Sequence, residues 1–268
     1  LTTVFISIAI GGGAGASVIT GQAFGRVNGK EVKESISVSL ISFLVISIIL
    51  AIIGYTFSPS ILRALNTPLN IDKDADIYLR IYFLGLPFLF MYNILSSIFN
   101  ALGKSRIPLF LLIFSSLLNI ILDIVAVTVL EMGVAGAAWA TLISQAISAM
   151  LSFCILLRKM RKIEGRIERY FSFGILSEMS GIALPSILQQ SVISFGMMLV
   201  QSVVNTFGSE VLAGYSAAIR VDSLSTVSIG AIGNALCSYT AQNVGAGNER
   251  RIIRGYHMSF ILVLIFSA

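Results

Sequence analysis

Long apolar segments without charge recur along the whole chain and constrain its fold more than any other feature. Stretches of about 20 or more residues, the length that a helix needs to cross a bilayer, are bounded by charged or polar turns. They lie near 2–24, 36–59, 78–102, 107–130, 134–157, 179–206 and 211–241, and an eighth apolar segment runs from 255 to the end. Runs such as ISFLVISIILAIIG (41–54) lack the alternation of a membrane β-strand. The pattern predicts an all-α, polytopic transmembrane helix bundle that spans the lipid bilayer with seven full helices and part of an eighth.

Composition excludes several classes of protein. Only 12% of the 268 residues are charged, against about 25% in soluble domains. The chain has one histidine and two cysteines, and neither CxxC, HExxH nor GxxxxGK[ST] occurs. We therefore expect no enzymatic activity and no cofactor, apart from a coupling ion. The cysteines, Cys154 and Cys237, lie in apolar runs and are expected to be buried.

Basic residues alternate between the predicted loops. Fourteen follow the first, third, fifth and seventh spans, whereas only Arg63, Lys73 and Arg80 lie on the opposite side. The fourteen are Arg26, Lys30, Lys33, Lys104, Arg106, Arg158, Lys159, Arg161, Lys162, Arg166, Arg169, Arg250, Arg251 and Arg254. By the positive-inside rule these loops face the cytoplasm, so the first span runs inward. We expect a multi-pass protein of the plasma (cytoplasmic or inner) membrane, with at least one further span before residue 1. Topology accounts for the net charge of +5, so no nucleic-acid partner is expected.

An internal repeat appears when the sequence is shifted by 220 residues. ITGQAFGRVNGK (19–30) then aligns with YTAQNVGAGNER (239–250), and each copy closes a span at its inner end. The identities include Thr20/Thr240, Gln22/Gln242, Gly25/Gly245 and Asn28/Asn248. Because six helices separate the copies, the repeat is parallel, with its pseudo-twofold axis along the membrane normal. This symmetry is typical of transporters whose halves rock around a central cavity.

The repeat divides the chain into parts. We expect an N-terminal lobe over residues 1–157, a cytoplasmic inter-lobe linker over 158–178 and the start of a second lobe over 179–268. Gly25 and Gly245 are predicted to hold the left-handed position after a helix, and Asn28 and Asn248 to cap the next one.

One acidic residue lies deep within a predicted span. Asp123 follows Asn119 by four residues, so the two side chains share a helix face. Asp123 and Thr141 are each seven residues from the outer end of their span, which predicts equal depth, about 10 Å below the outer boundary. Carboxylate, amide and hydroxyl oxygens suit a proton or Na⁺. The three residues are predicted to form a cation-coupling site, a tentative Na⁺ site included; the alternative is a hydrogen-bonded clamp between helices.

Other polar residues inside spans are candidates to line a cavity. They are Gln189 and Gln190 after Pro185, Asn93 and Asn100 below Pro87, and Arg220 with Asp222. For the amides the alternative is hydrogen bonding between helices, and for Arg220 and Asp222 a structural ion pair with other helices is favoured.

These segments resemble the multidrug and toxin extrusion (MATE) family of secondary transporters, from its second to its ninth helix. The matching segments are QAFGRVNG (22–29), GLP (85–87) through ALGKSRIP (101–108), NIILD (119–123), GVAGAAWAT (133–141), LAGYSAAIRVDSL (212–224) and QNVGAGN (242–248). The resemblance implies two six-helix lobes around a central cavity, incomplete in this sequence. It also implies export of bulky, often cationic organic compounds in exchange for H⁺ or Na⁺, by a monomer. Asn119, Asp123 and Thr141 match the positions that form a cation site in the N-terminal lobe of the family.

Two departures from the family pattern bear on coupling. The first helix, which brings a further acidic residue to that site, is absent from this sequence. One branch of the family carries a membrane glutamate near the position of Ile193, which is apolar. Its absence favours coupling through the N-terminal lobe. The main alternative function is a flippase for lipid-linked oligosaccharides, whose cavity should hold more intramembrane Arg and Lys than Arg220 alone.

Overall fold

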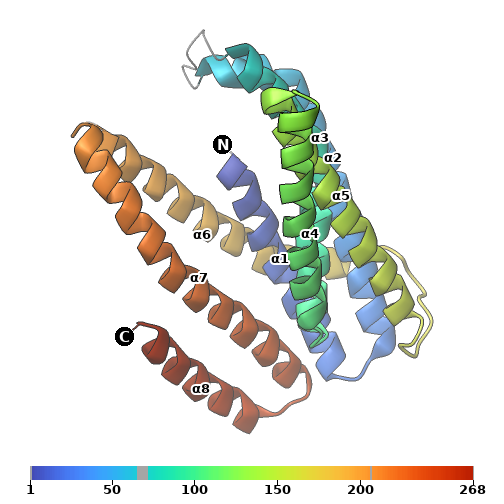
Figure 1. Ribbon diagram of the computed structural model, residues 1–268. Helices are drawn as coiled ribbons and strands as arrows, with labels where there is room; N and C mark the ends of the chain where they lie inside the picture. The colour runs from blue at the N-terminus through green and yellow to red at the C-terminus, as the bar shows by residue number, and fades with distance from the viewer. Residues whose placement is uncertain (1, 65–71, 206, 268) are drawn as a thin grey trace.

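The computed structural model describes residues 2–64, 72–205 and 207–267, and within them the chain is helical without any strand. The helices are α1 (Thr2–Gly25), α2 (Gly29–Ala64), α3 (Asp72–Ala101), α4 (Arg106–Ile124), a π-helical turn η1 (Val125–Val129), α5 (Gly133–Met160), α6 (Phe173–Asn205), α7 (Ser209–Gly245) and α8 (Glu249–Ser267) (Figure 1). The all-α prediction is confirmed.

Six helices in the described ranges are long and apolar enough to cross a membrane, namely α1 to α6, with η1 extending α4. Helix α7 has 37 residues but is not among them, so this criterion of length and hydropathy supports six of the seven predicted full spans. Arg220, Asp222 and a series of serines lower its hydropathy. A span can carry such residues where it faces the interior of a bundle rather than lipid.

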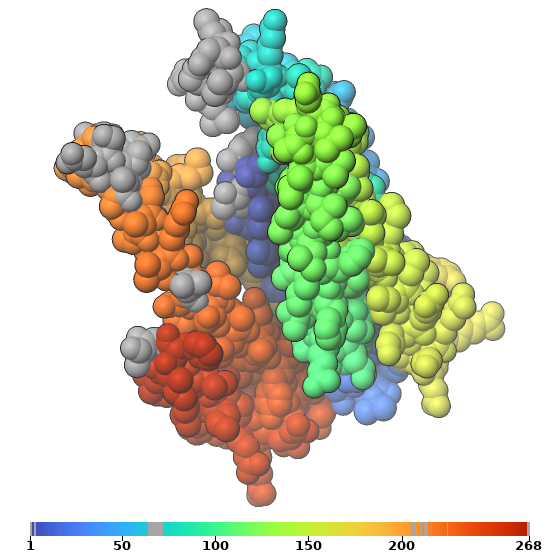
Figure 2. Space-filling model, in the orientation of Figure 1, coloured from blue at the N-terminus to red at the C-terminus, as the bar shows by residue number. Residues whose placement is uncertain are grey.

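The helices form two groups joined through α1. In Figure 1, α2 to α5 stand on one side, α6 to α8 lean to the other, and α1 lies between them. The groups meet at the end that carries the basic α1–α2 and α7–α8 turns and spread apart at the opposite end, where Figure 2 shows a hollow between them. With the basic turns on the inner side, this arrangement opens outward.

Helix α3 forms the centre of the first group. Phe83, Phe90 and Ile94 lie on one face of α3 and are fully buried. The ring of Phe5 on α1 packs edge-on against Phe83 at 5.5 Å, and Phe43 on α2 packs against Phe90 at 6.2 Å between centroids. Aromatic contacts at two levels of this face thus hold α3 against α1 and α2.

Helix α1 packs against α6 through small residues. A β-carbon at Gly11 would lie 2.7 Å from Cα of Ile187, and one at Gly15 would lie 3.0 Å from Cβ of Ala183. This is the GxxxG spacing, which lets two membrane helices approach until their backbones touch. The spacing of Gly11 and Gly15 is visible in the sequence, but it was not among the predicted features.

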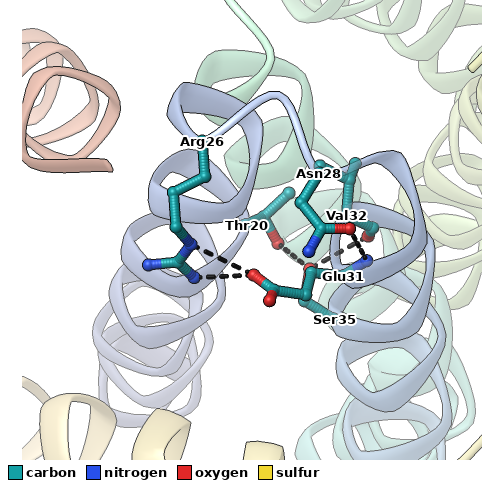
Figure 3. Close-up of polar contacts among 6 residues, drawn as sticks. All are labelled: Thr20, Arg26, Asn28, Glu31, Val32 and Ser35. Atoms are coloured by element: carbon teal, nitrogen blue, oxygen red, sulfur yellow. Dashed lines mark hydrogen bonds and ion pairs between the residues drawn. The ribbon is translucent and has the colours of Figure 1, made fainter. Parts of the chain in front are cut away.

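The two copies of the repeat form the same turn. The amide of Asn28 donates to the carbonyl of Ala23 at 3.2 Å, and the amide of Asn248 donates to that of Asn243 at 2.9 Å. The Oδ1 atom of each asparagine accepts a hydrogen bond, at 3.2 Å in both copies, from the amide three residues later. Figure 3 shows the first copy, where Asn28 caps α2. The predicted asparagine caps are confirmed.

The left-handed residues of these turns differ from those predicted. They are Val27, with φ of 56°, and Gly247, with φ of 65°. Gly25 and Gly245 are the last helical residues of α1 and α7, so their predicted left-handed role is wrong. Each helix includes its glycine, because the turn that connects it to the next helix begins at the residue after the glycine, Arg26 or Ala246.

A different contact requires Gly25 and Gly245. A β-carbon at Gly25 would lie 2.8 Å from the carbonyl carbon of Gln242, and one at Gly245 would lie 2.8 Å from that of Gln22. Since the shift of 220 residues interchanges these two contacts, they are related by the pseudo-twofold axis. Helices α1 and α7 therefore run in the same direction and cross at their inner ends, which confirms the parallel repeat.

Candidate functional site

Helices α4 and α5 pack as an antiparallel pair joined by side-chain hydrogen bonds. Ser148 donates to the carbonyl of Leu111 at 3.5 Å, and Ser115 donates to that of Ser144 at 3.3 Å. Near the outer end, a β-carbon at Gly136 would lie 3.0 Å from Cβ of Ala126. Small and hydroxyl side chains thus allow close approach along the whole pair.

Asn119 and Thr141 meet across this pair, as the sequence predicted. Nδ2 of Asn119 donates to Oγ1 of Thr141 at 3.4 Å, and Thr141 donates to the carbonyl of Ala137 at 3.0 Å. Asn119 and Thr141 are both half-buried. A polar patch therefore exists on the face that α4 shares with α5.

Asp123 lies one turn further toward the outer end. Because Asn119 is level with Thr141, Asp123 lies roughly 6 Å beyond them along α4. The expectation that Asp123 and Thr141 have equal depth is therefore wrong. The π-helical turn η1, which starts two residues after Asp123, accommodates an extra residue and shifts the register between the two helices.

The carboxylate of Asp123 carries an unsatisfied oxygen. Its Oδ1 atom is buried and has no hydrogen-bond partner among the described residues. A buried carboxylate oxygen without a donor is costly, and a proton or a cation would satisfy it. No group of three or more His, Cys, Asp or Glu side chains that could hold a metal occurs in the described ranges. The carboxylate of Asp123, with an amide and a hydroxyl one turn away, offers oxygen ligands of the kind that H⁺ or Na⁺ can use.

A polar cavity of about 210 Å³ lies between α1, α3 and α7. Asn93 and Asn100 line it, as predicted, together with Ser17 of α1 and Asn234 and Ser238 of α7. A second space of about 420 Å³ shares Asn100, Asn234 and Ser238 with it and extends toward the inner end of α7.

The α7 wall of these cavities was missed in the sequence. Asn234, Ser238 and Gln242 recur every four residues and form a polar stripe on one face of α7. That spacing was a readable signal. Cys237 also lines the first cavity, and both Cys237 and Cys154 are exposed, so the expectation that the cysteines are buried is wrong.

Gln242 links α7 to the N-terminal group beneath the cavity. Its Nε2 atom donates to the carbonyl of Ala101 at the end of α3 at 2.8 Å. Between α1 and α7, the hydroxyls of Ser17 and Ser238 lie 3.2 Å apart. These contacts close the inner end of the space between the two groups.

The other predicted cavity residues lie elsewhere. Gln189, Gln190, Arg220 and Asp222 line neither of these two spaces. Arg220 and Asp222 are exposed, and neither forms an ion pair with any residue that the structure describes, so the favoured ion pair is not found. Asp222 accepts a hydrogen bond from Thr226 of its own helix at 3.2 Å. The α7 residues that line the cavity or bond to α3 are Asn234, Cys237, Ser238 and Gln242, and Arg220 and Asp222 lie three or more turns before them.

Comparison with protein families gives a match over most of the chain. A family model described as MatE matches residues 1–125 and 185–268. YpnP of Bacillus subtilis, named a probable multidrug resistance protein, is 37% identical over 74% of this chain and 44% of its own length. YoeA of the same species, with the same description, is 30% identical over 93% of this chain and 56% of its own length. A protein of Shewanella oneidensis named FAD transporter is 26% identical over 99% of the chain and 60% of its own length.

Solved structures give the same result. A crystal structure of a MATE protein in complex with MaD5 has a TM-score of 0.89 at 25% identity, and covers 99% of this chain and 61% of that one. The outward-facing conformation of a MATE family transporter has a TM-score of 0.85 at 24% identity, over 99% of this chain and 60% of that one. The chain spans about half the length of the Bacillus relatives.

Proposed function

The chain belongs to the MatE family, whose members are transporters, and we propose that the whole protein is a secondary antiporter that exports drugs or other bulky organic compounds in exchange for H⁺ or Na⁺. The observation that carries the proposal is the polar cavity between α1, α3 and α7. It lies where the two halves of a parallel repeat meet, which is where such transporters bind their substrates.

The arrangement of the helices supports alternating access. The inner end is held shut by the reciprocal contacts of Gly25 and Gly245 and by the hydrogen bond of Gln242 to α3. The outer end is open (Figure 2). A transporter needs a second arrangement in which these contacts separate, and substrate and cation must each favour a different one of the two.

Asp123 is the group that we propose for coupling. Its unsatisfied Oδ1 atom can take up a proton or contact Na⁺, with Asn119 and Thr141 one turn away. Binding of either cation removes the cost of the buried unsatisfied oxygen, so it changes the packing of α4 against α5. These helices belong to the same group as α3, which lines the cavity, so a change there can reach the substrate.

The cavity lining favours neutral or singly cationic organic compounds with hydrogen-bonding groups. Amides and hydroxyls line both spaces, and no Arg or Lys of the described chain is among their lining residues. A pyrophosphate-linked oligosaccharide, the cargo of the flippase alternative, would need basic side chains there. The same argument disfavours FAD, the substrate in the name of the Shewanella relative, as a cargo of this cavity.

We also propose that the protein resides in the cytoplasmic membrane, with the basic turns inside. Multidrug proteins of Bacillus subtilis are among its relatives. Export from the cell then corresponds to substrate leaving through the end that is open in Figure 2.

Transport by the reconstituted whole protein tests the proposal. Proteoliposomes loaded with ethidium should export it when a Na⁺ or H⁺ gradient is imposed in the exchanging direction. Asn234→Leu, which removes a polar group from the cavity wall, should lower the rate about tenfold. Gln189→Leu, outside the cavity, is the matched control and should retain the rate. Export that needs neither gradient, or equal rates in the two variants, would contradict the proposal.

A further inference from the structure

An apolar groove of about 490 Å³ lies on the flank of the N-terminal group, away from the central cavity. Its walls come from α2 (Ile41, Leu44), α3 (Phe88) and α5 (Phe153, Leu157). Among the residues that line the groove, only Ser37 and the aromatic Tyr170 carry a polar side-chain group. Its size and composition suit a hydrocarbon chain.

The segment between α5 and α6 closes the inner end of this groove. Ile167 and Tyr170 of that segment line it. The segment is fixed to α2: Lys33 donates to the carbonyl of Gly165 at 2.7 Å, and Lys30 pairs with Glu168 at 2.6 Å. The groove is therefore bounded at its inner end by a held segment rather than open along the whole helix.

Positive charge gathers at the same end. The groove face of α5 runs through Phe153 and Leu157 and continues one turn later to Arg161. Arg158, Lys159, Arg161 and Lys162 are all exposed, and none of them forms an ion pair with a described residue. The nearby carboxylate of Glu168 is engaged by Lys30, and this hydrogen bond holds the pKa of Glu168 below its ordinary value. Glu164 is the other acidic residue in the segment between α5 and α6, and it follows the basic residues 158–162 in the sequence.

We propose that this groove binds one anionic phospholipid of the inner leaflet. Its acyl chain lies along α2, α3 and α5, and its phosphate contacts Arg161 and Lys162. The charge of the site matches the ligand, because the inner leaflet is the anionic one and juxtamembrane basic residues attract its headgroups. Tyr170, 68% exposed at the inner end, has the amphipathic ring that is enriched at this depth of a membrane. A cationic drug would meet repulsion at the same rim.

Lipid binding to the whole transporter tests this proposal. Protein delipidated in detergent is titrated with phosphatidylglycerol or with phosphatidylcholine of the same chains, and bound lipid is counted by native mass spectrometry. We expect one phosphatidylglycerol to bind at least about fivefold more tightly than phosphatidylcholine, given the attraction of two cationic side chains. Arg161→Gln with Lys162→Gln should abolish this preference.

A control of equal charge separates the site from general surface attraction. Arg250→Gln with Arg254→Gln removes two exposed charges from the same side of the membrane and should keep the preference. Leu44→Trp fills the groove and should weaken binding of both lipids while the protein stays folded by circular dichroism. Equal binding of the two lipids to the unaltered protein would overturn the proposal. So would equal loss of preference in both charge variants, or a groove occupied by a second copy, seen as a dimer that lipid does not dissociate.

Discussion

Replacing Gly25 by alanine should force the inner ends of the two halves apart. The new methyl group would lie 2.8 Å from the carbonyl carbon of Gln242, and Gly245→Ala would place one at the same distance from that of Gln22. Carbon atoms pack at about 3.5 Å or more, so each substitution requires a separation of at least about 0.7 Å at this crossing. The two helices meet here by their backbones, which cannot move aside as a flexible side chain can. Overpacking of this kind costs about 1–3 kcal/mol.

The separation can be measured by pulsed electron paramagnetic resonance. Spin labels at Val27→Cys and Ala246→Cys report the distance between the inner ends, in a background where Cys154 and Cys237 are replaced by alanine. Both labelled positions are exposed. We expect Gly25→Ala and Gly245→Ala each to shift the population toward longer distances.

Gly233→Ala is the control for this measurement. No described atom outside its own helix backbone lies within 4 Å of a β-carbon at Gly233, which is also on α7. It should leave the distances unchanged. Identical distance distributions in Gly25→Ala, Gly245→Ala and Gly233→Ala would refute the argument that the glycines hold the inner end shut.

Three further predictions follow from single features of the structure. Cys237 lines the cavity, so a charged thiol reagent added on the outer side should react with it, and transported substrate should slow that reaction. Cys154 lies on α5 and does not line the cavity, so substrate should not protect it. Equal behaviour of the two thiols would exclude a binding role for the cavity. Val27→Gly should raise the free energy of unfolding by up to about 1 kcal/mol, because the left-handed conformation costs a β-branched residue about 1–2 kcal/mol. Gly247 occupies the equivalent position in the second copy of the turn. A lower melting temperature in Val27→Gly would contradict this prediction. The contact with Lys30 lowers the pKa of Glu168, so this ion pair stabilises the segment between α5 and α6 fully above the ordinary glutamate pKa of about 4.3. The stabilisation is lost as the pH falls through the lowered pKa of Glu168, so cleavage at Arg166 and Arg169 by an acid-tolerant protease should increase below pH of about 4. Glu168→Gln removes the ion pair and should show the faster cleavage already at neutral pH.

Much of the architecture was predictable because membrane helices leave simple signals. Continuous apolar runs predicted the helices. The charge asymmetry of the loops predicts their orientation in the membrane. The repeat around Asn28 and Asn248 predicted the parallel relation of α1 and α7, and both asparagines cap the following helix as expected. Local chemistry suffices for such features, since a cap depends on residues within one turn.

Features that depend on contact between helices were predicted less well. The meeting of Asn119 and Thr141 was predicted, but the depth of Asp123 was not, because counting residues from the turn assumes a regular helix and η1 is π-helical. The role of Gly25 was misread because the sequence shows a helix end there, whereas the reason for glycine is a carbonyl 217 positions later in the chain, at Gln242. Backbone approach between distant segments leaves no local pattern.

The polar stripe on α7 shows a third case. Asn234, Ser238 and Gln242 follow helical spacing and could have been read from the sequence as a cavity wall. The residues of α7 that were predicted to line a cavity, Arg220 and Asp222, are charged and lie in its other half. The inner half, where α7 packs on α1 and α3, forms the cavity.

Cation-driven export by Asp123→Asn tests the central claim most directly. The substitution keeps the shape of the side chain and removes the charge, and the whole transporter is reconstituted at matched abundance with ethidium inside and an imposed H⁺ or Na⁺ gradient. Asp222→Asn, which alters an exposed acid bonded within its own helix, is the control. The account predicts that Asp123→Asn folds and inserts but loses the response to both gradients, and that Asp222→Asn and the unaltered protein respond alike. Export by Asp123→Asn at the unaltered rate under either gradient would show that the half-buried carboxylate of Asp123 is only a packing residue.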